Sequence, residues 1–184
     1  MSVEGQFFLS VIGSIEHAEF YEVNNVYCKY SFHFGPDWSV VAGIEEGLTQ
    51  MCKCSNEPRN LAVWNFPLDI TFKSTNPHGW PQLIMSIYGL DFFGRDVIRG
   101  YGVCHLPLKT GYHEKSTESS SMLQHFMEWL TGRRPELIDP TILASGGGRE
   151  LTRMRVEGVV TVTFNVILKD LYKLGYDNGE KWKK

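Results

Sequence analysis

Alternating hydrophobic and polar residues along the chain predict β-strands. The stretch 64–73 reads Trp-Asn-Phe-Pro-Leu-Asp-Ile-Thr-Phe-Lys, so that an apolar residue recurs at every second position. A period of two places successive side chains on opposite faces of a strand, which predicts a half-buried strand here. Residues 160–168 repeat the pattern, with valine, phenylalanine and leucine on one face and threonine and asparagine among the residues on the other.

The same alternation predicts further strands, separated by turn-forming glycine, proline and asparagine. They are expected at 7–15, 26–34, 38–44, 83–88 and 97–108. Residues 45–60 lose the alternation and are expected to form a surface loop. About eight strands follow one another without regularly intervening helices. The predicted fold class is therefore all-β, an antiparallel β-sandwich.

One helix is predicted as an insertion near residues 122–131. Ser121 is a suitable N-cap, and Leu123, Phe126, Met127 and Leu130 recur at helical spacing. The apolar stripe of this helix is expected to pack on a sheet or on a partner. The preceding stretch, residues 110–121, is rich in serine, threonine and glutamate, so we expect it to be a mobile polar loop whose role stays open.

Composition and length favour a single folded domain. The chain has 184 residues, of which 42% are hydrophobic and 21% charged, as is typical of globular proteins. We expect one domain over residues 1–170 and a short, lysine-containing polar tail over residues 171–184. The formal charge of −3 provides no field that would attract nucleic acid. No apolar run approaches the ~18–20 residues that span a bilayer, and no signal peptide is recognisable, so a cytoplasmic location is expected.

Four cysteines, Cys28, Cys52, Cys54 and Cys104, are too few and too irregularly spaced to form a disulfide framework. We expect reduced thiols. The pair Cys52 and Cys54 could be half of a zinc site, but such sites normally use a wider gap and a second ligand pair. Ordinary loop cysteines are the favoured interpretation.

Motifs of known catalytic chemistry are absent from the sequence. There is no nucleophile elbow, no zinc-protease motif, no phosphate-binding loop and no dinucleotide fingerprint. The six histidines are scattered singly, at positions 17, 33, 78, 105, 113 and 125. We therefore predict no enzyme activity, no catalytic residue and no cofactor. A catalytic set assembled by the fold from distant residues stays open, because such sets are recognised by geometry.

The segment 87–100 looks like the strand, acidic loop and strand of a calcium-binding C2 domain. Calcium takes six to eight oxygen ligands, mostly from carboxylates. This loop has only Asp91 and Asp96, and Gly89 stands where that family has its first aspartate. The expected partner loop near residues 22–26 has asparagines and no aspartate. Calcium is therefore not expected, and the alternative role for both aspartates is to cap turns.

Four motifs occur in a specific order. They are Trp64-Asn65-x-Pro67-x-Asp69, Gly79-Trp80-Pro81-x-Leu83, Asp91-x-x-Gly94-Arg95, and Gly100-Tyr101-Gly102 followed by Pro107. Together they resemble the B9-domain family, a C2-like group of the ciliary base, over roughly residues 7–170. This resemblance sharpens the fold prediction to a C2-like antiparallel β-sandwich.

The resemblance also implies a function. Members of this family belong to the Meckel syndrome module of the ciliary transition zone, where B9-domain proteins associate with one another and lie near tectonic and transmembrane proteins. The implied role is a non-enzymatic scaffold needed for cilium assembly, a membrane-diffusion barrier and Hedgehog signalling. The implied location is the cilium base, with its transition zone and basal body, and the implied ciliopathies are Meckel and Joubert syndromes.

The motif residues also have physical roles. Trp64 and Trp80 are expected to fill the core rather than bind a partner. Phe92 and Phe93 are adjacent at a loop tip and cannot both point into one sheet, so at least one is expected at the surface unless the pair folds back on the loop.

With Arg95 beside them, Phe92 and Phe93 are our candidate partner-contact residues, because aromatic residues and arginine are enriched at interface centres. The alternative function is calcium-independent peripheral membrane binding through the same tip and the lysine tail.

Overall fold

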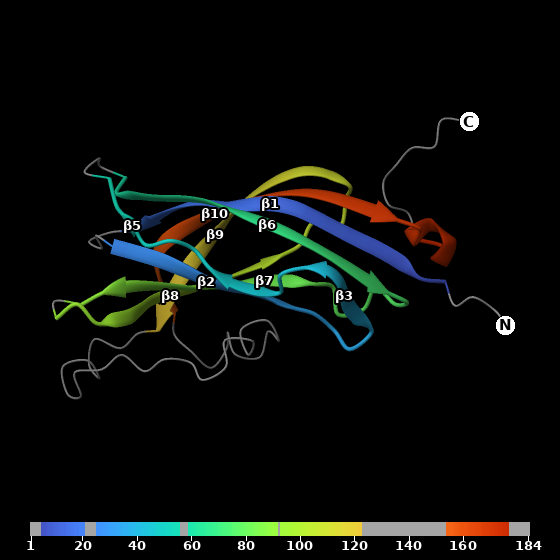
Figure 1. Ribbon diagram of the computed structural model, residues 1–184, viewed down its shortest axis with the longest axis horizontal. Helices are drawn as coiled ribbons and strands as arrows, with labels where there is room; N and C mark the ends of the chain where they lie inside the picture. Colours follow the sequence, from blue (N-terminus) through green and yellow to red (C-terminus); the bar gives the residue numbers. More distant parts are fainter. Residues whose placement is uncertain (1–4, 21–24, 56–58, 92, 123–153, 177–184) are drawn as a thin grey trace.

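The computed structural model describes residues 5–20, 25–55, 59–91, 93–122 and 154–176 of the chain. These residues form ten strands and one short 3-10 helix, η2, and Figure 1 shows their arrangement. The strands are β1 (Phe7–Phe20), β2 (Asn25–His33), β3 (Trp38–Gly43), β4 (Glu46–Leu48), β5 (Cys52–Lys53), β6 (Leu61–Ser74), β7 (Gln82–Leu90), β8 (Asp96–His105), β9 (Gly111–Met122) and β10 (Met154–Lys169).

Every strand pair is antiparallel, and the strands follow one hydrogen-bonded path in the order β3-β6-β1-β10-β9-β8-β7-β2-β4, with β5 beside β2. In Figure 1, β1, β6 and β10 lie in one layer, and β2, β7 and β8 lie in the other. β9 connects the layers, since it pairs with β10 along its whole length and with β8 at one position, Tyr101 opposite Ser120. The predicted all-β antiparallel sandwich is confirmed.

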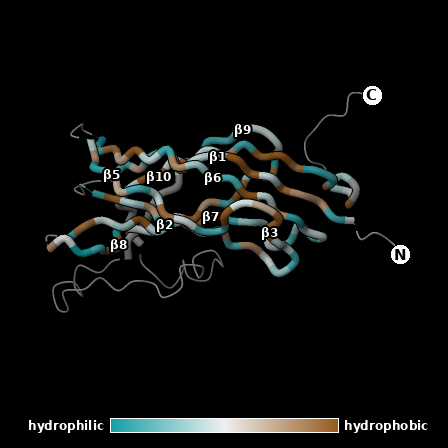
Figure 2. The backbone as a smooth tube through the Cα atoms, in the orientation of Figure 1, coloured by the Kyte–Doolittle hydropathy of each residue, from teal (hydrophilic) through white to brown (hydrophobic). Residues whose placement is uncertain are grey.

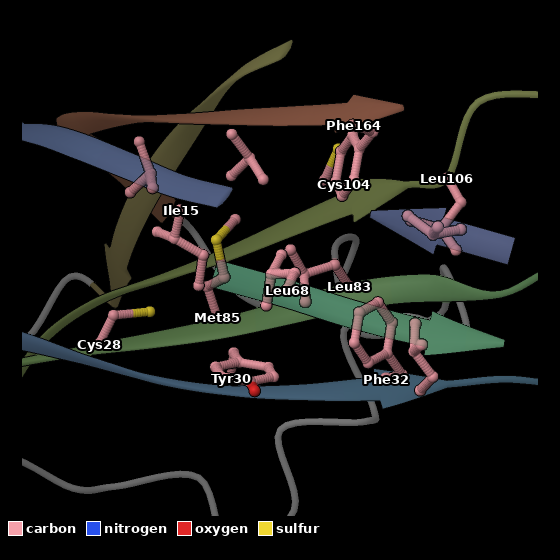
Figure 3. Packing of buried hydrophobic residues seen from close by; sticks show 14 of the residues in the cluster. Ile15, Cys28, Tyr30, Phe32, Leu68, Leu83, Met85, Cys104, Leu106 and Phe164 are labelled. Atoms are coloured by element: carbon pink, nitrogen blue, oxygen red, sulfur yellow. The ribbon is translucent and has the colours of Figure 1, made fainter. Parts of the chain in front are cut away.

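The core lies between the two layers and is formed by the residues that the alternation predicts to face inward. Ile70 and Phe72 of β6, together with Val162 and Phe164 of β10, have no exposed surface. Figure 3 shows side chains of both layers meeting in this cluster, and Figure 2 shows hydrophobic and hydrophilic residues alternating along the strands. Each large apolar side chain buried in this way contributes about 1.5–3 kcal/mol relative to exposure.

β7 departs from simple alternation, because both of its faces are buried. Ile84 and Ser86 face away from the main core but are only 1% and 4% exposed. On β8, which pairs with β7, Ile98 and Tyr101 form a second, smaller apolar cluster. The alternation of apolar and polar residues at 83–88 therefore predicts the strand but not the burial of its second face.

The polar stretch expected to be a mobile loop is instead β9. Its residues pair with β10 from Gly111 opposite Val166 to Met122 opposite Met154. The strand is formed by backbone pairing with an established neighbour, for which apolar side chains are not required. The expected loop at 45–60 likewise contains two very short strands, β4 and β5.

The inserted helix is not confirmed. Ser121, its expected N-cap, and Met122 both lie in β9. The rest of the predicted helix, residues 123–131, lies outside the described residues.

After β10 the chain forms the 3-10 helix η2 (Leu171–Leu174). Leu171 is buried in the core and Leu174 packs against it, so ordered packing continues past residue 170, where the tail is predicted to begin. Residues 177–184 lie outside the described part. Among the described residues, no helix has the length and apolar character needed to cross a membrane.

Candidate functional site

The turn between β7 and β8 is the candidate contact site, and we call residues 91–95 the tip. The backbone N–H of Asp91 donates to the carbonyl of Arg95 at 2.9 Å, and that of Gly94 donates to the carbonyl of Asp91 at 3.1 Å. Gly94 has a positive φ of 75°, and no atom lies within 4 Å of the position a Cβ would take. Glycine is therefore favoured here by backbone conformation and not by lack of space.

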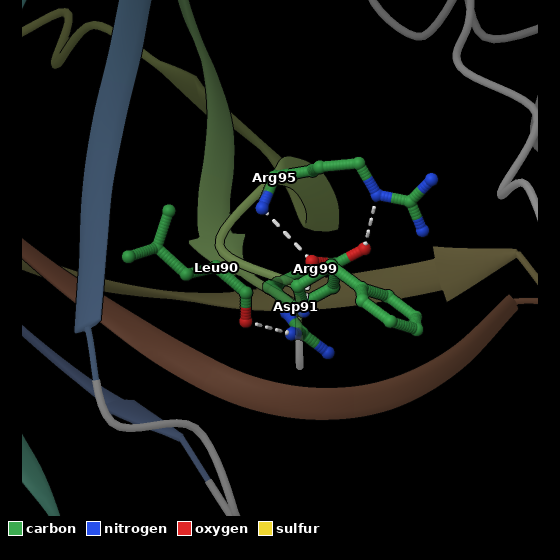
Figure 4. Close-up of polar contacts among 5 residues, drawn as sticks. Leu90, Asp91, Arg95 and Arg99 are labelled. Atoms are coloured by element: carbon green, nitrogen blue, oxygen red, sulfur yellow. Dashed lines mark hydrogen bonds and ion pairs between the residues drawn. The ribbon is translucent and has the colours of Figure 1, made fainter.

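Asp91 holds the tip together with both carboxylate oxygens, as Figure 4 shows for its contacts with Arg95. Oδ1 accepts hydrogen bonds from the backbone N–H groups of Phe93 and Arg95, each at 2.8 Å. Oδ2 accepts one from Nε of Arg95, also at 2.8 Å. These contacts, led by the backbone hydrogen bond from Arg95, hold the pKa of Asp91 below its ordinary value. The turn-capping role is confirmed for Asp91.

The geometry of the tip determines which carboxylate oxygens are available to bind calcium. Both oxygens of Asp91 are engaged within the turn, and Gly89 is a buried residue of β7. Asp96 is exposed at the start of β8. No group of three or more histidine, cysteine, aspartate and glutamate side chains that could hold a metal ion occurs in the described ranges. Calcium independence stays a prediction that a titration has to test.

Phe93 projects from the tip and is 77% exposed. The guanidinium carbon of Arg95 lies 5.2 Å from the centre of its ring, within range of a cation–π contact. Phe93 therefore does not fold back into the sheet. Phe92, the other aromatic residue of the prediction, lies outside the described residues.

Arg99 was not singled out by the sequence, but it braces the base of the tip. Its Nη2 donates to the carbonyl of Leu90 at 2.7 Å, so that β8 is tied to the end of β7 (Figure 4). A lone arginine on a strand has no sequence signal that distinguishes it from a solvent-exposed one, which explains the omission.

Of the two tryptophans of the family motifs, Trp64 belongs to the core, as predicted, and Trp80 is partly buried and packs against the core. Trp64 is 3% exposed, and its Nε1–H donates to the carbonyl of Val26 at 3.3 Å. Trp80 packs against Phe7 and Trp38, and its Nε1–H donates to a backbone carbonyl. Both tryptophans therefore contribute to the packing of the fold.

All four cysteines are free thiols. Cys28, Cys54 and Cys104 are buried, and Cys52 is partly exposed on β5. Burial raises the pKa of Cys28 and Cys54, with proximity to Cys52 a second cause for Cys54. The free cysteines agree with the expectation of reduced thiols.

Five of the six histidines are described, and each lies on a different element. They are His17 on β1, His33 on β2, His78 in the turn before β7, His105 on β8 and His113 on β9. None belongs to a cluster of potential metal ligands among the described residues. His125 lies outside them.

Comparison with known proteins gives a consistent result. A family model described as "Ciliary basal body-associated, B9 protein" matches residues 9–167. B9 domain-containing protein 1 of Xenopus laevis is 55% identical over 178 residues, covering 94% of this chain and 90% of the relative. Human B9 domain-containing protein 2 is 29% identical, covering 91% and 97%. Among solved structures, a C2 domain of plant extended synaptotagmin 1 matches over 89% of this chain and 95% of its own length, at 13% identity and a TM-score of 0.44.

Proposed function

The chain belongs to the B9 family of ciliary basal body-associated proteins, and from this premise we propose that it is a non-enzymatic interaction component at the base of the cilium. The observation that carries the proposal is the family match over residues 9–167 together with 55% identity to a B9 domain-containing protein 1. A chain that similar over nearly its whole length shares the fold of that relative.

The more specific proposal is that the protein binds other B9-domain proteins within the Meckel syndrome module of the transition zone, near tectonic and transmembrane proteins. In this role it contributes to cilium assembly, to the membrane-diffusion barrier and to Hedgehog signalling. The support is the family resemblance.

The tip has the features of a contact point. Phe93 and Arg95 present an aromatic ring and a cation at the surface, and Asp91 holds the backbone that carries them. A contact residue that is held in place before binding loses less conformational entropy when the complex forms. Aromatic and arginine side chains are also the residue types that most often dominate binding energy.

Binding to B9 domain-containing protein 2 tests this proposal. The purified chain and that protein are mixed, and the affinity is measured by calorimetry. We expect a 1:1 complex, and we expect the double variant Phe93→Ala, Arg95→Ala to weaken it at least tenfold, as for a hot-spot pair.

A matched control is Tyr112→Ala, since Tyr112 is 68% exposed and lies near the start of β9, which follows the end of β8 that is opposite the tip. An unchanged affinity in the tip variant would remove the tip from the interface, whereas no binding by the unaltered chain would argue against the B9 partner.

The alternative function, peripheral membrane binding without calcium, is favoured by the exposed ring of Phe93 beside a cation. An aromatic side chain can enter the interfacial region while the arginine contacts anionic headgroups. Co-sedimentation with phosphatidylserine vesicles is expected to exceed that with phosphatidylcholine vesicles, to be the same in calcium and in chelator, and to fall in Phe93→Asp. Equal recovery of Phe93→Asp and the unaltered chain would contradict this function.

A further inference from the structure

The hydrogen-bonded path of the sandwich has two ends, β3 and β4, and these strands are consecutive in the sequence. Among the described strands, β3 pairs only with β6 in one layer, and β4 pairs only with β2 in the other. Only Ile44 and Glu45 separate them. The described strands therefore leave one side of the sandwich without strand pairing, while β9 bridges the layers elsewhere.

The crossover between β3 and β4 is fixed by close packing. Gly43 has a φ of 100°, and a Cβ at this position would collide with the backbone carbonyl of Asp69. A Cβ at Gly47 would lie 2.8 Å from the ring of Tyr30, a buried core residue. The chain therefore passes between the layers in a conformation that favours glycine at Gly43, and the ring of Tyr30 leaves little room for a side chain at Gly47.

Hydrogen bonds to β2 secure the end of the crossover. The carbonyl of Glu45 accepts from the backbone N–H of Phe32 at 2.9 Å. Thr49 pairs with Cys28 twice, because its N–H donates to the Cys28 carbonyl and its Oγ1 accepts from the Cys28 N–H, both at 2.9 Å. The position of the crossover is thus set by contacts with the core strand β2.

This rigid crossover exposes apolar side chains. Val41, Ile44 and Leu48 are 52%, 66% and 57% exposed. Val41 is the extra residue of a bulge in β3, which removes it from the alternation. Gly47 faces the ring of Tyr30, so Leu48 points to the other side of β4.

The free edge of β3 lacks most of the usual protection against pairing with another strand. Natural edge strands carry lysine, proline or inward charges that block such pairing. Residues 38–51 contain no lysine, arginine or proline, and their only charged residues are Glu45 and Glu46. The bulge at Val41 is the one protective feature, and it also turns an apolar side chain outward.

We propose that the open side, defined as the free edge of β3 together with Val41, Ile44 and Leu48, binds an extended segment of a partner protein. The segment adds a strand to β3, so that the unpaired backbone groups of the edge find partners. Its apolar side chains cover those three residues, and a basic side chain pairs with Glu45 or Glu46. A strand is the expected occupant because it can form hydrogen bonds with the backbone groups of a free strand edge. The negative charges of the two glutamates disfavour binding to an anionic membrane.

This surface is distinct from the tip. Figure 1 shows the turn between β7 and β8 at one end of the molecule and β3 toward the other. The inference goes beyond the proposed function, because it names a second surface and the form of its occupant. Binding at the open side and binding of a B9 partner at the tip can be tested independently of each other.

The test uses the full chain, labelled for NMR, and ten-residue peptides that alternate valine or isoleucine with lysine or threonine. We expect amide shifts confined to residues 39–48. The double variant Ile44→Asp, Leu48→Asp is expected to weaken binding at least tenfold.

The matched control is Ile12→Asp, Ile167→Asp, since both isoleucines are 50% exposed and lie on β1 and β10. This control is expected to bind as the unaltered chain does. Peptides N-methylated at alternate residues, which cannot donate to a strand edge, are expected not to bind.

Several results would overturn the proposal. They are no shifts up to about 1 mM peptide, shifts located at the tip, or equal binding by the N-methylated peptides. Sedimentation that shows the chain dimerising through the open side, with the dimer lost in Ile44→Asp, Leu48→Asp, would replace the partner segment by a second copy. The tip variant Phe93→Ala is expected to bind these peptides normally, which separates this test from that of the proposed function.

Discussion

The tip and the open side both present apolar side chains to solvent, but they are held in place in different ways. At the tip, the carboxylate of Asp91 accepts hydrogen bonds from the backbone of Phe93, which carries the exposed ring, and of Arg95. On the open side, backbone conformation and packing at Gly43 and Gly47 position the exposed residues. A side chain with a titratable group can be released by a proton, whereas a close-packed backbone cannot. The tip therefore depends on an ionised carboxylate, and the open side on backbone packing.

The two surfaces also differ in how strongly they are connected to the core. The hydrogen bonds of Asp91 join residues of the tip to one another, and no atom lies within 4 Å of the position that a Cβ would take at Gly94. In the crossover of the open side, Gly43 packs against the backbone of Asp69 and Gly47 packs against the ring of Tyr30. A change at the tip is expected to remain local, while a change at the crossover is expected to reach the whole sandwich.

The largest effect is expected from alanine at Gly43. Both the positive φ and the collision with the Asp69 carbonyl oppose a side chain there, so we expect a loss of about 3 kcal/mol or more in the free energy of unfolding. Urea denaturation followed by fluorescence measures this loss.

The matched variant is Gly94→Ala at the tip, where only the backbone conformation opposes a side chain. A loss of about 1–2 kcal/mol is expected there. Equal losses in the two variants would show that the crossover has no special connection to the core.

Thr49→Val is expected to have the next largest effect. It leaves the buried N–H of Cys28 without its acceptor, which costs about 1–3 kcal/mol. The control is Thr71→Val on β6, whose hydroxyl bonds only to the side chain of Ser10. If denaturation shows the same stability for both variants, the hydrogen bonds of Thr49 do not secure the open side.

Asp91→Ala is expected to loosen the tip without unfolding the sandwich. The amides of Phe93 and Arg95 lose their acceptor, so their hydrogen exchange is expected to accelerate about tenfold or more. The amide of Cys28 on β2, which bonds to Thr49 after the crossover, serves as the internal control. Acceleration at Cys28 as well would mean that the two surfaces are coupled.

The smallest effect is a response to acid. The turn lowers the pKa of Asp91 from its ordinary value of 3.8, so the ionised carboxylate stabilises the folded tip. This stabilisation is complete above pH 3.8 and is lost as the pH falls through the lowered pKa. Carbon NMR of the Asp91 carboxyl is expected to give a midpoint below 3.8. A midpoint at or above that value would contradict the hydrogen bonding described for the tip.

The strands that form the core could be predicted from the sequence, because each buries one face and shows it as alternation. β6 and β10 are the clearest cases, with Ile70 and Phe164 among their fully buried residues. β9 could not be predicted, since its serines, threonines and glutamates have no apolar period. Its pairing with β10 depends on a neighbour that is remote in sequence. A pattern within one segment cannot report a partner outside it.

The candidate site was predicted in part. The exposure of Phe93 and the turn-capping role of Asp91 follow from adjacent aromatics and from an aspartate three residues before a glycine. The open side was missed, because residues 45–60 read as an ordinary loop. The open side exists because β3 and β4 are the two terminal strands of the hydrogen-bonded order. This is a property of the topology, and a local sequence pattern does not indicate it.

The position of β1 has a consequence for synthesis on the ribosome. β1 is translated before the other described strands, and in the folded protein it lies between β6 and β10. One of its edges therefore stays unpaired until β10 has been synthesised. At about 5–20 residues per second, roughly 5–20 seconds separate the completion of Ser74 from that of Lys169. During that interval the nascent chain holds an unpaired edge of fourteen residues, Phe7–Phe20. A holding chaperone, or early contact with a partner, would protect this edge until translation ends.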